Sequence, residues 1–245
     1  KYKNVSIFCS GENIGYGGGN NYGLQKVDTK YALILNPDII CEKNYFENLK
    51  DYLNDELDFS IIGSQYMDNA TYAPAGFFDS DSTLKDAHHI QNLNLSKVDW
   101  VVGCSMLINL KKFKSKSIFD ENFFLFFEEF DLCKFLKKNG EKVYSSSKLI
   151  VNHFGFHSST DLNNEIDLIK LRNWHYMWSY FYYHRKNEGY FNALKVSFGK
   201  LIRSFFKMIL FTLILNKKKR INYLYRFLGL LNSIMGKKSS FRINN

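Results

Sequence analysis

Short apolar runs alternate with amphipathic stretches along the first part of the chain. The continuous apolar runs at residues 31–35 and 59–63 predict buried strands, and the apolar alternation at 5–9 predicts a further short strand. Helical spacing of the apolar residues over 45–53 predicts a helix between the two runs. Strands that alternate with helices predict an α/β class, and continuous apolar runs are typical of a mostly parallel sheet.

The next part of the pattern is less regular. The polar stretch at 66–96 predicts a long loop region over the active face, and an apolar segment at 100–110 follows it. Residues 119–140 predict a turn and then an amphipathic helix that ends at a glycine. Two further short strands are expected at 142–144 and 149–151.

The distribution of charge changes in the last part of the chain, where helical spacing dominates from Glu165 onward. From Gly189 to Asn245 the chain carries 12 Lys or Arg residues and no Asp or Glu, whereas the residues before it carry 21 basic and 24 acidic ones. The positive excess of the +9 chain therefore lies in this last segment. A slightly negative body with a basic appendage predicts that the appendage meets an anionic surface.

An apolar run at 208–215 lies within this basic segment and is followed by four cations at 217–220. A spanning helix needs about 20 apolar residues, and Lys200, Arg203 and Lys207 interrupt the segment upstream. The pattern favours a basic amphipathic helix that lies in a membrane interface. The alternative is a helix that packs on the rest of the chain, or on a second copy in a homo-oligomer.

The four cysteines, Cys9, Cys41, Cys104 and Cys133, lie far apart and form no C-x-x-C pair. This spacing excludes a small disulfide framework and predicts reduced thiols, as in the cytosol. Together with the basic appendage, it predicts a peripheral protein on the cytoplasmic face of a membrane.

A glycine-rich segment lies between residues 11 and 23. Glycine permits positive φ and lets the backbone approach a ligand closely. If a helix begins near Asn20, its free N–H groups can face a phosphate. The alternative is a glycine-rich surface turn, and the glycines alone leave the two interpretations balanced. The candidate ligand-binding residues of this segment are Asn13, Gly15, Gly18, Asn20 and Asn21.

Polar residues at the ends of expected strands form a candidate metal site. Asn36, Pro37 and Asp38 end the run at 31–35, and His153 follows the last expected strand. Open α/β sheets bind ligands at the carboxyl ends of their strands. A carboxylate there can hold Mg²⁺ or Mn²⁺ against a diphosphate, and a histidine can complete the metal shell. The alternatives are a strand-ending turn and a structural histidine.

Acidic residues are crowded among phenylalanines at 119–133. Glu128, Glu129 and Asp131 lie in this stretch, and the first two directly follow a pair of phenylalanines. Aromatic surroundings raise the pKa of a carboxyl group, which suits a general base. The alternative is an amphipathic helix whose acids face water.

Taken in order, these segments resemble family-2 glycosyltransferases with a GT-A fold, especially their rhamnosyltransferase-like branch. That branch shows N-x-G-[FY]-[AG]-x-[GA]-N-N-x-G, an apolar strand ending in N-P-D, G-[AC]-x-[ML]-[LM]-[IV], F-D-E-x-F-F-x-[YF]-x-E-[DE]-x-D-[LW]-[CS] and a closing H-x-x-x-x-S. The matching residues are 13–23, 33–38, 103–108, 119–133, and His153 with Ser158.

The resemblance implies an inverting enzyme that moves a sugar, with rhamnose as the candidate, from a nucleotide-diphosphate donor to a lipid-linked or polysaccharide acceptor. It implies that Asp38 and His153 hold Mg²⁺ or Mn²⁺. By the same resemblance Glu129 is the catalytic base, in a place where the family most often has aspartate. Asp131 is its companion acid and Glu128 its neighbour. Asn36 and the glycine-rich segment would bind the donor.

Two motifs of the family have no match in this sequence. Members begin with a strand similar to V-x-I-V-I-V-T-Y-N, and a second strand ends in D-N-x-S; these hold the nucleotide base and ribose. Two βα units correspond to roughly 50–70 residues. We therefore expect an N-terminally truncated GT-A catalytic domain over 1–160 and a helical, basic region over 161–245.

Two other classes of function stay open at this point. One is a non-catalytic scaffold derived from such an enzyme. The other is a nucleic-acid-binding protein that uses the basic, tyrosine-rich tail. Nucleic-acid binding would need a basic stripe on the body as well, and the body is net negative. We therefore expect no nucleic-acid partner.

Overall fold

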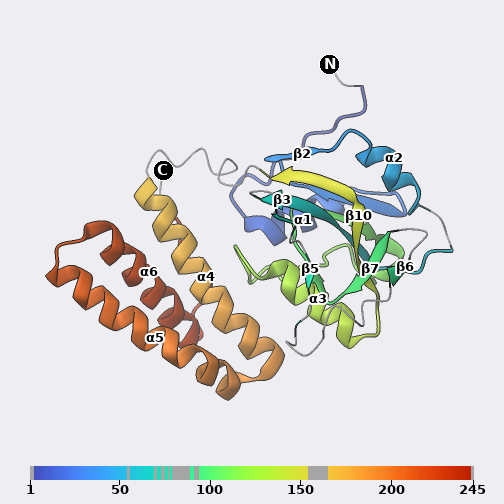
Figure 1. The fold of residues 1–245 in the computed structure, drawn as a ribbon. Helices are drawn as coiled ribbons and strands as arrows, with labels where there is room; N and C mark the ends of the chain where they lie inside the picture. The colour runs from blue at the N-terminus through green and yellow to red at the C-terminus, as the bar shows by residue number, and fades with distance from the viewer. Residues whose placement is uncertain are drawn as a thin grey trace. The chain divides into compact units, whose positions relative to one another are not determined.

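The computed structural model describes residues 3–53, 56–68, 71–72, 75–76, 78, 89–90, 94–153 and 165–243. The chain forms two compact units (Figure 1). The first consists of Lys1–Glu12, Gly19–Phe119 and Glu129–Ser158, and the second of Asn13–Gly18, Asp120–Glu128 and Ser159–Asn245.

The first unit carries the sheet. Its elements are β1 (Tyr31–Leu35), β2 (Ile39–Cys41), α2 (Tyr45–Lys50), β3 (Ile61–Asp68), β4 (Thr71–Tyr72), β5 (Ala75–Gly76), β6 (His89–Ile90), β7 (Leu95–Val98), β8 (Trp100–Val101), β9 (Ser105–Asn109), the 3₁₀ helix η3 (Leu110–Lys112) and β10 (Val143–His153). Two helices, α1 (Gly15–Leu24) and α3 (Glu128–Lys138), begin in the second unit and continue in the first. The second unit also contains α4 (Glu165–Glu188), α5 (Tyr190–Leu213) and α6 (Lys217–Ile234).

The main sheet has the strand order β1-β9-β3-β10-β7-β6, with β2 added to β10 and β4 added to β3. Among the described strands, β3 and β10 form the only parallel pair, and all other pairs are antiparallel. The α/β class is therefore confirmed, but the expected mostly parallel sheet is wrong. A continuous apolar run reports burial on both faces and not strand direction. Strand β9 is buried at every position and still pairs antiparallel with both of its neighbours.

The core of the first unit lies between the sheet and α2. Tyr45, Tyr52, Phe59 and Ile62 are fully buried in it, together with Leu107 of β9. Helix α2 is short, yet it buries large side chains, so packing against the sheet stabilises it more than its own propensity does. This packing holds the end of β2 and the start of β9 in place.

The two short strands expected at 142–144 and 149–151 are one strand, β10, with a bulge between Ser146 and Ile150. The Ser146 hydroxyl accepts hydrogen bonds from the N–H groups of Lys148 and Leu149, both at 3.1 Å. The Ser146 side chain thus accepts the hydrogen bonds that a neighbouring strand would accept if β10 had no bulge.

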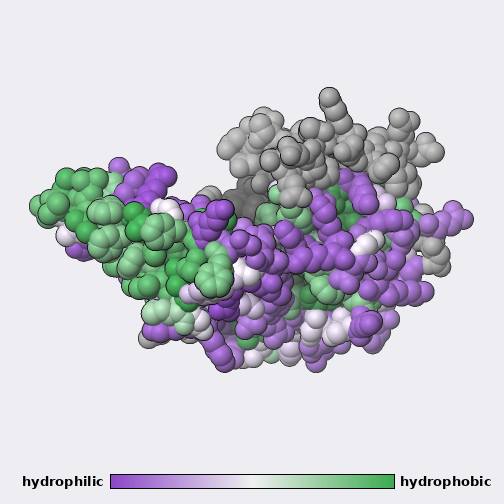
Figure 2. Space-filling view, turned by 90° about the horizontal axis from the view of Figure 1, so that it is seen from below, coloured by the Kyte–Doolittle hydropathy of each residue, from purple (hydrophilic) through white to green (hydrophobic). Residues whose placement is uncertain are grey.

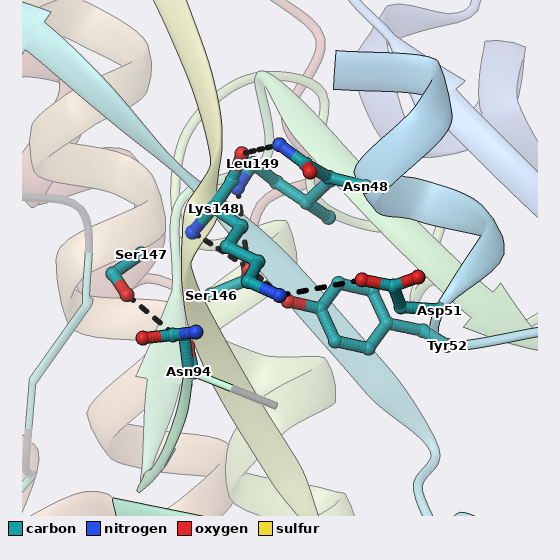
Figure 3. A network of polar contacts seen from close by, with 8 residues as sticks. All are labelled: Asn48, Asp51, Tyr52, Asn94, Ser146, Ser147, Lys148 and Leu149. Carbon is teal, nitrogen blue, oxygen red and sulfur yellow. Dashed lines mark hydrogen bonds and ion pairs between the residues drawn. The ribbon is translucent and has the colours of Figure 1, made fainter. Parts of the chain in front are cut away.

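Helix α2 is tied to this bulge by several polar contacts (Figure 3). Tyr52 and Ser146 share a hydrogen bond between their hydroxyls at 2.8 Å. The Asn48 amide donates to the Lys148 carbonyl at 3.0 Å, and the Lys148 ammonium lies 3.3 Å from Asp51. The serine-rich break in the apolar pattern is therefore an anchoring point and not a loop.

Two expectations for the N-terminal segment are wrong. Residues 5–9 form no strand, and Val5 and Ile7 are exposed. An apolar alternation becomes a strand only where a neighbour supplies ladder hydrogen bonds, and the described part of the sheet supplies none to it. Helix α1 begins at Gly15 and not near Asn20, so most of the glycine-rich segment is helical.

Most of the loop region expected at 66–96 lies outside the described residues, which there include the end of β3, the short strands β4 to β6 and the start of β7. The expected helix that ends at a glycine is confirmed as α3, followed by Gly140 at φ +74°. A glycine in the left-handed region commonly ends a helix in this way.

The second unit is built on α4, α5 and α6, which lie side by side (Figure 1). Met177, Phe181, Ala193 and Leu230 form its buried core. A Cβ atom on Gly229 of α6 would lie only 2.1 Å from the carbonyl oxygen of Trp174 of α4. Glycine therefore permits the close packing of these two helices. The expected helical character from Glu165 onward is confirmed.

Candidate active site

The first group of candidate residues lies where β1 ends beside the start of β9. The Asn36 N–H donates to the Cys104 carbonyl at 2.9 Å, which continues the ladder for one residue beyond β1. Asp38 follows in the turn before β2, and its Oδ1 atom is buried. The interpretation of Asn36 to Asp38 as a strand-ending turn is therefore correct as geometry, and the turn still buries a carboxylate oxygen.

The pairing of β2 with β10 brings the second predicted metal ligand to the same place. His153 lies opposite Ile39 in this antiparallel pair, so its backbone is next to the residue that follows Asp38. The structure describes the backbone of His153 and not its side chain. The backbones of Ile39 and His153, 114 positions apart in sequence, are thus paired directly after Asp38.

Glu129 lies in the first turn of α3 and is half-buried. Burial raises the pKa of Glu129, and hydrogen bonds from the N–H groups of Glu129 and Gly103 oppose the shift without cancelling it. The charged form of a carboxylate is disfavoured when water is removed. A carboxylate with a raised pKa takes a proton more readily, as the base prediction requires.

The pKa of the buried Cys104 thiol is affected by the charges of both Asp38 and Glu129. Burial raises its pKa to about 12, and the negative charges of Glu129 and Asp38 add to the effect. Their backbone neighbours agree, because the Gly103 N–H bonds to Glu129 and the Cys104 carbonyl accepts from Asn36. The predicted base and the turn of the predicted metal ligand therefore both contact residues 103–104, although the two acids are 91 positions apart in sequence.

A buried cluster of three hydroxyls holds the start of β9 beneath this site. The Tyr45 hydroxyl lies 2.7 Å from that of Ser105 and 3.0 Å from that of Ser64, and the two serines are 2.6 Å apart. Burial is the main reason that the pKa of Tyr45 is raised, so all three groups are neutral. Sequence reasoning missed this cluster, because isolated serines in apolar strands carry no distinctive pattern.

Two acids of the phenylalanine-rich stretch, Glu128 and Asp131, do not face water. Glu128 is 2% exposed and Asp131 is 5% exposed. The alternative of an amphipathic helix with solvated acids is therefore wrong for these two residues. Glu128 belongs to the second unit and Asp131 to the first, on either side of Glu129.

The backbone directly before α3 is strained. Phe126 and Phe127 have φ values of +70° and +73°, in the left-handed region that bulky residues rarely adopt. The Phe127 ring contacts the rings of Tyr176 and Tyr183 of α4, with centroids 5.6 Å and 5.4 Å apart. These contacts hold a conformation that costs about 1–3 kcal/mol per residue. Sequence reasoning missed this strain.

The start of the glycine-rich segment packs on the phenylalanine-rich stretch within the second unit. The Asn13 side chain accepts a hydrogen bond from the Gly15 N–H at 3.1 Å. Gly15 has φ +81°, and a Cβ atom there would lie 2.3 Å from the Phe124 carbonyl oxygen. That same carbonyl accepts from the Tyr16 N–H at 3.1 Å. Gly15 therefore permits the backbone of Phe124 to approach closely, which is a contact within the chain and not with a ligand.

The remaining candidates of this segment lie inside α1. Asn21 is fully buried, and its carboxamide exchanges two hydrogen bonds with the backbone of Phe119. Gly18 is buried and Asn20 is half-buried. Because α1 begins at Gly15, neither asparagine lies at the free N–H groups of the helix start.

No family model matches the chain. The chain is similar to Agl10 of Haloferax volcanii, a low-salt glycan biosynthesis hexosyltransferase, with 30% identity over 142 residues, which are 54% of this chain and 46% of Agl10. It is also similar to the rhamnosyltransferase WbbL of Escherichia coli K12, with 24% identity over 213 residues, which are 73% of this chain and 74% of WbbL.

The chain spans about half the length of Agl10. Both relatives are named as glycosyltransferases, one a hexosyltransferase and the other a rhamnosyltransferase. The mixed α/β structure is compatible with an enzyme of that class.

Proposed function

We propose that the chain is an inverting glycosyltransferase that moves a hexosyl group, with rhamnose as the candidate, from a nucleotide-diphosphate donor to a lipid-linked or polysaccharide acceptor in surface glycan synthesis. The observation that carries this proposal is that Glu129 and the Asn36–Asp38 turn both hydrogen-bond the backbone of residues 103–104, through the Gly103 N–H and the Cys104 carbonyl. A carboxylate with a raised pKa beside a second carboxylate suits a base close to a metal-bound leaving group. The same observation favours an enzyme over a non-catalytic scaffold.

In the proposed reaction Glu129 acts on the acceptor. Its carboxylate takes the proton of the acceptor hydroxyl while that oxygen bonds to the anomeric carbon of the donor sugar. The bond between that carbon and the diphosphate oxygen breaks with its electrons on the diphosphate. Attack from the face opposite to the leaving group inverts the anomeric centre, through a transition state similar to an oxocarbenium ion.

Asp38 and His153 are the residues that would hold Mg²⁺ or Mn²⁺. Among the side chains that the structure describes, no group of three or more His, Cys, Asp or Glu residues could bind a metal by itself. The donor set nevertheless fits Mg²⁺ or Mn²⁺, because such ions are commonly held by one or two carboxylates and by substrate phosphate oxygens. When bound, the ion would offset charge on the leaving diphosphate.

The metal proposal has a direct test that does not depend on turnover. Mn²⁺ binding in the presence of a nucleoside diphosphate, followed by electron paramagnetic resonance, should be lost in Asp38→Ala. The control Asp28→Ala changes an exposed carboxylate and should leave binding unchanged. Equal binding by both variants would contradict the role of Asp38.

The other candidates have supporting roles in this proposal. Asn36, next to the turn of Asp38, is proposed to contact the donor, and Asp131 and Glu128 to support the position of Glu129. Asn21 and Gly15 are proposed to act on the donor site only through the parts of the chain that they position.

We propose that the enzyme works as a peripheral protein at the cytoplasmic face of a membrane, where a lipid-linked acceptor is presented. In the described part of the chain, no helix is both long and apolar enough to cross a bilayer.

The function is tested by release of nucleoside diphosphate from a panel of nucleotide-diphosphate sugars, with and without glycan acceptors. We expect release that depends on both the acceptor and Mn²⁺. No release of nucleoside diphosphate with any donor and acceptor, or identical release by the wild type and Glu129→Gln, would favour the non-catalytic scaffold.

A further inference from the structure

Helix α5 exposes a continuous apolar stripe. Large apolar side chains recur along it at helical intervals, and their exposed fractions lie between 38% for Phe205 and 74% for Leu213. Figure 2 shows apolar side chains gathered over the helical unit, in contrast to the mostly polar surface around them. The stripe consists of Phe198, Ile202, Phe205, Phe206, Ile209 and Leu213.

This stripe is distinct from the face by which α5 packs in its own unit. Ala193, Ser197 and Ser204 are buried, and Leu194 and Leu201 pack on the core of the three helices. Helix α5 is therefore apolar on an inner face and on an outer one. A soluble protein rarely leaves so long an apolar surface exposed without a partner for it.

The segment that carries the stripe has cations and no carboxylates, since no Asp or Glu occurs from Gly189 to the end of the chain. Lys200 lies over the Tyr180 ring and Lys207 donates to the Tyr223 hydroxyl, so both face their own unit. Lys195 is exposed and lies three residues before Phe198, on the same side of α5. An anionic lipid surface complements the apolar side chains and the exposed cations together.

The next helix carries cations where its own electrostatics disfavour them. Lys217, Lys218, Lys219 and Arg220 form the first turn of α6, which has no acidic residue to balance them. The N-terminus of a helix carries a partial positive charge, so cations there destabilise it. Lys218 has a partner in Glu165, 2.6 Å away. A run of cations at this place is better explained by an external anion than by the stability of the helix.

The stripe and these cations meet at an apolar groove of about 440 Å³. Helix α5 lines the groove with Met208, Ile209, Thr212 and Leu213. Helix α6 lines it with Arg220 and Leu224. Apolar walls with one cation at the rim suit an acyl chain that is attached to an anionic headgroup.

We propose that the α5–α6 hairpin docks on an anionic lipid bilayer, with the α5 stripe in the acyl boundary, Lys217 and Arg220 at the headgroups, and the groove around Arg220 occupied by a lipid. The inference rests on the proposed function in one respect, that a lipid-linked acceptor makes docking useful. It specifies the residues that reach the membrane and the lipid charge that they require.

The apolar part of the proposal is tested by a matched pair of double variants of the full chain. Phe198 and Phe206 are each 63% exposed on α5, while Phe46 and Phe135 are each 56% exposed on the first unit. Phe198→Glu/Phe206→Glu and Phe46→Glu/Phe135→Glu therefore add equal charge at similar exposure. In sedimentation with phosphatidylglycerol vesicles we expect roughly ten-fold or more loss of binding for the first and little for the second.

The charged part is tested separately by neutral replacements. Each cation near an anionic surface contributes about five-fold to binding, so Lys217→Gln/Arg220→Gln should bind roughly 25-fold more weakly at low salt. Lys50→Gln/Lys114→Gln removes two exposed lysines of the first unit and should bind as the wild type does. Salt should weaken wild-type binding, since it screens the headgroup charges.

The proposal is overturned if the variant and control doubles sediment alike, or if phosphatidylcholine vesicles bind the wild type as well as anionic ones do. It is also overturned if analytical ultracentrifugation shows a dimer that only Phe198→Glu/Phe206→Glu abolishes, because a second copy then covers the stripe. Transfer to a water-soluble acceptor separates the two proposals. Vesicle binding without transfer contradicts the function alone, and transfer without vesicle binding contradicts the docking alone.

Discussion

Asn21 and Phe119 are joined by a closed pair of hydrogen bonds across 98 positions of sequence. The Asn21 amide donates to the Phe119 carbonyl at 2.9 Å, and its oxygen accepts from the Phe119 N–H at 3.0 Å. The Asn21 side chain thus makes the two hydrogen bonds that a neighbouring strand would otherwise make with the buried Phe119 backbone. Because Phe119 opens the stretch that leads to the candidate base, α1 helps to position that stretch.

We predict that Asn21→Asp destabilises the protein by about 1–3 kcal/mol, because a carboxylate oxygen would face the Phe119 carbonyl without a donor. The measurement is the free energy of unfolding in urea. Asn44→Asp is the control, since Asn44 is exposed at the start of α2 and makes no side-chain cap hydrogen bond. Equal effects of the two substitutions would contradict the role of the Asn21 pair.

We predict that Glu129→Gln lowers turnover by about 10²-fold or more, because glutamine keeps the shape of the side chain and cannot take a proton. Binding of the nucleotide donor, measured by calorimetry, should stay within a few-fold of the wild type. Glu128→Gln is the comparison one residue away. If Glu128→Gln is the damaging substitution and Glu129→Gln is mild, the base is Glu128.

The strain at Phe127 predicts an inverted order of glycine and alanine. Both substitutions remove the ring contacts, but only glycine adopts φ +73° without cost. Phe127→Gly should therefore be more stable than Phe127→Ala by about 1 kcal/mol. At buried Phe123, which has no positive φ, alanine should be the more stable replacement. Thermal unfolding of the four variants tests this, and the same order at both sites would exclude strain.

His175 predicts a loss of stability in acid. Burial lowers the pKa of His175 to about 4, from an ordinary value of 6.5, with the nearby Arg242 adding to the shift. The imidazole is neutral and bonded to Ser239 and to the Phe241 carbonyl, both at 2.9 Å. Below pH 6.5 the unfolded chain binds a proton at this site that the folded chain does not bind until about pH 4.

The free energy of unfolding should therefore fall by up to about 3 kcal/mol between pH 7 and pH 4 through this group. Urea unfolding at several pH values measures the slope. His175→Gln should be less stable than the wild type at pH 7 and should show a shallower slope. An unchanged slope in the variant would mean that other groups cause the acid sensitivity.

Local patterns predicted a good part of the first unit. The runs that became β1 and β3, the helix α2 and the glycine-terminated α3 are all encoded over a few neighbouring residues. Hydrophobicity predicts burial, and spacing predicts helix or strand, because both depend on nearby positions alone. The same reasoning predicted the wrong strand directions and a strand at 5–9, since pairing requires a partner elsewhere in the chain.

The candidate site also combines features that the sequence predicts with features that depend on distant contacts. By itself the sequence determined which groups are available for chemistry: the carboxyls of Asp38 and Glu129, the glycine-rich segment and the cations after Glu188. Only the tertiary structure decided that Glu129 and the turn of Asp38 both contact residues 103–104, and that the Asn21 side chain bonds to the Phe119 backbone. Convergence and burial arise from contacts between residues many positions apart, and the pKa of Glu129 is raised because those contacts remove water from it.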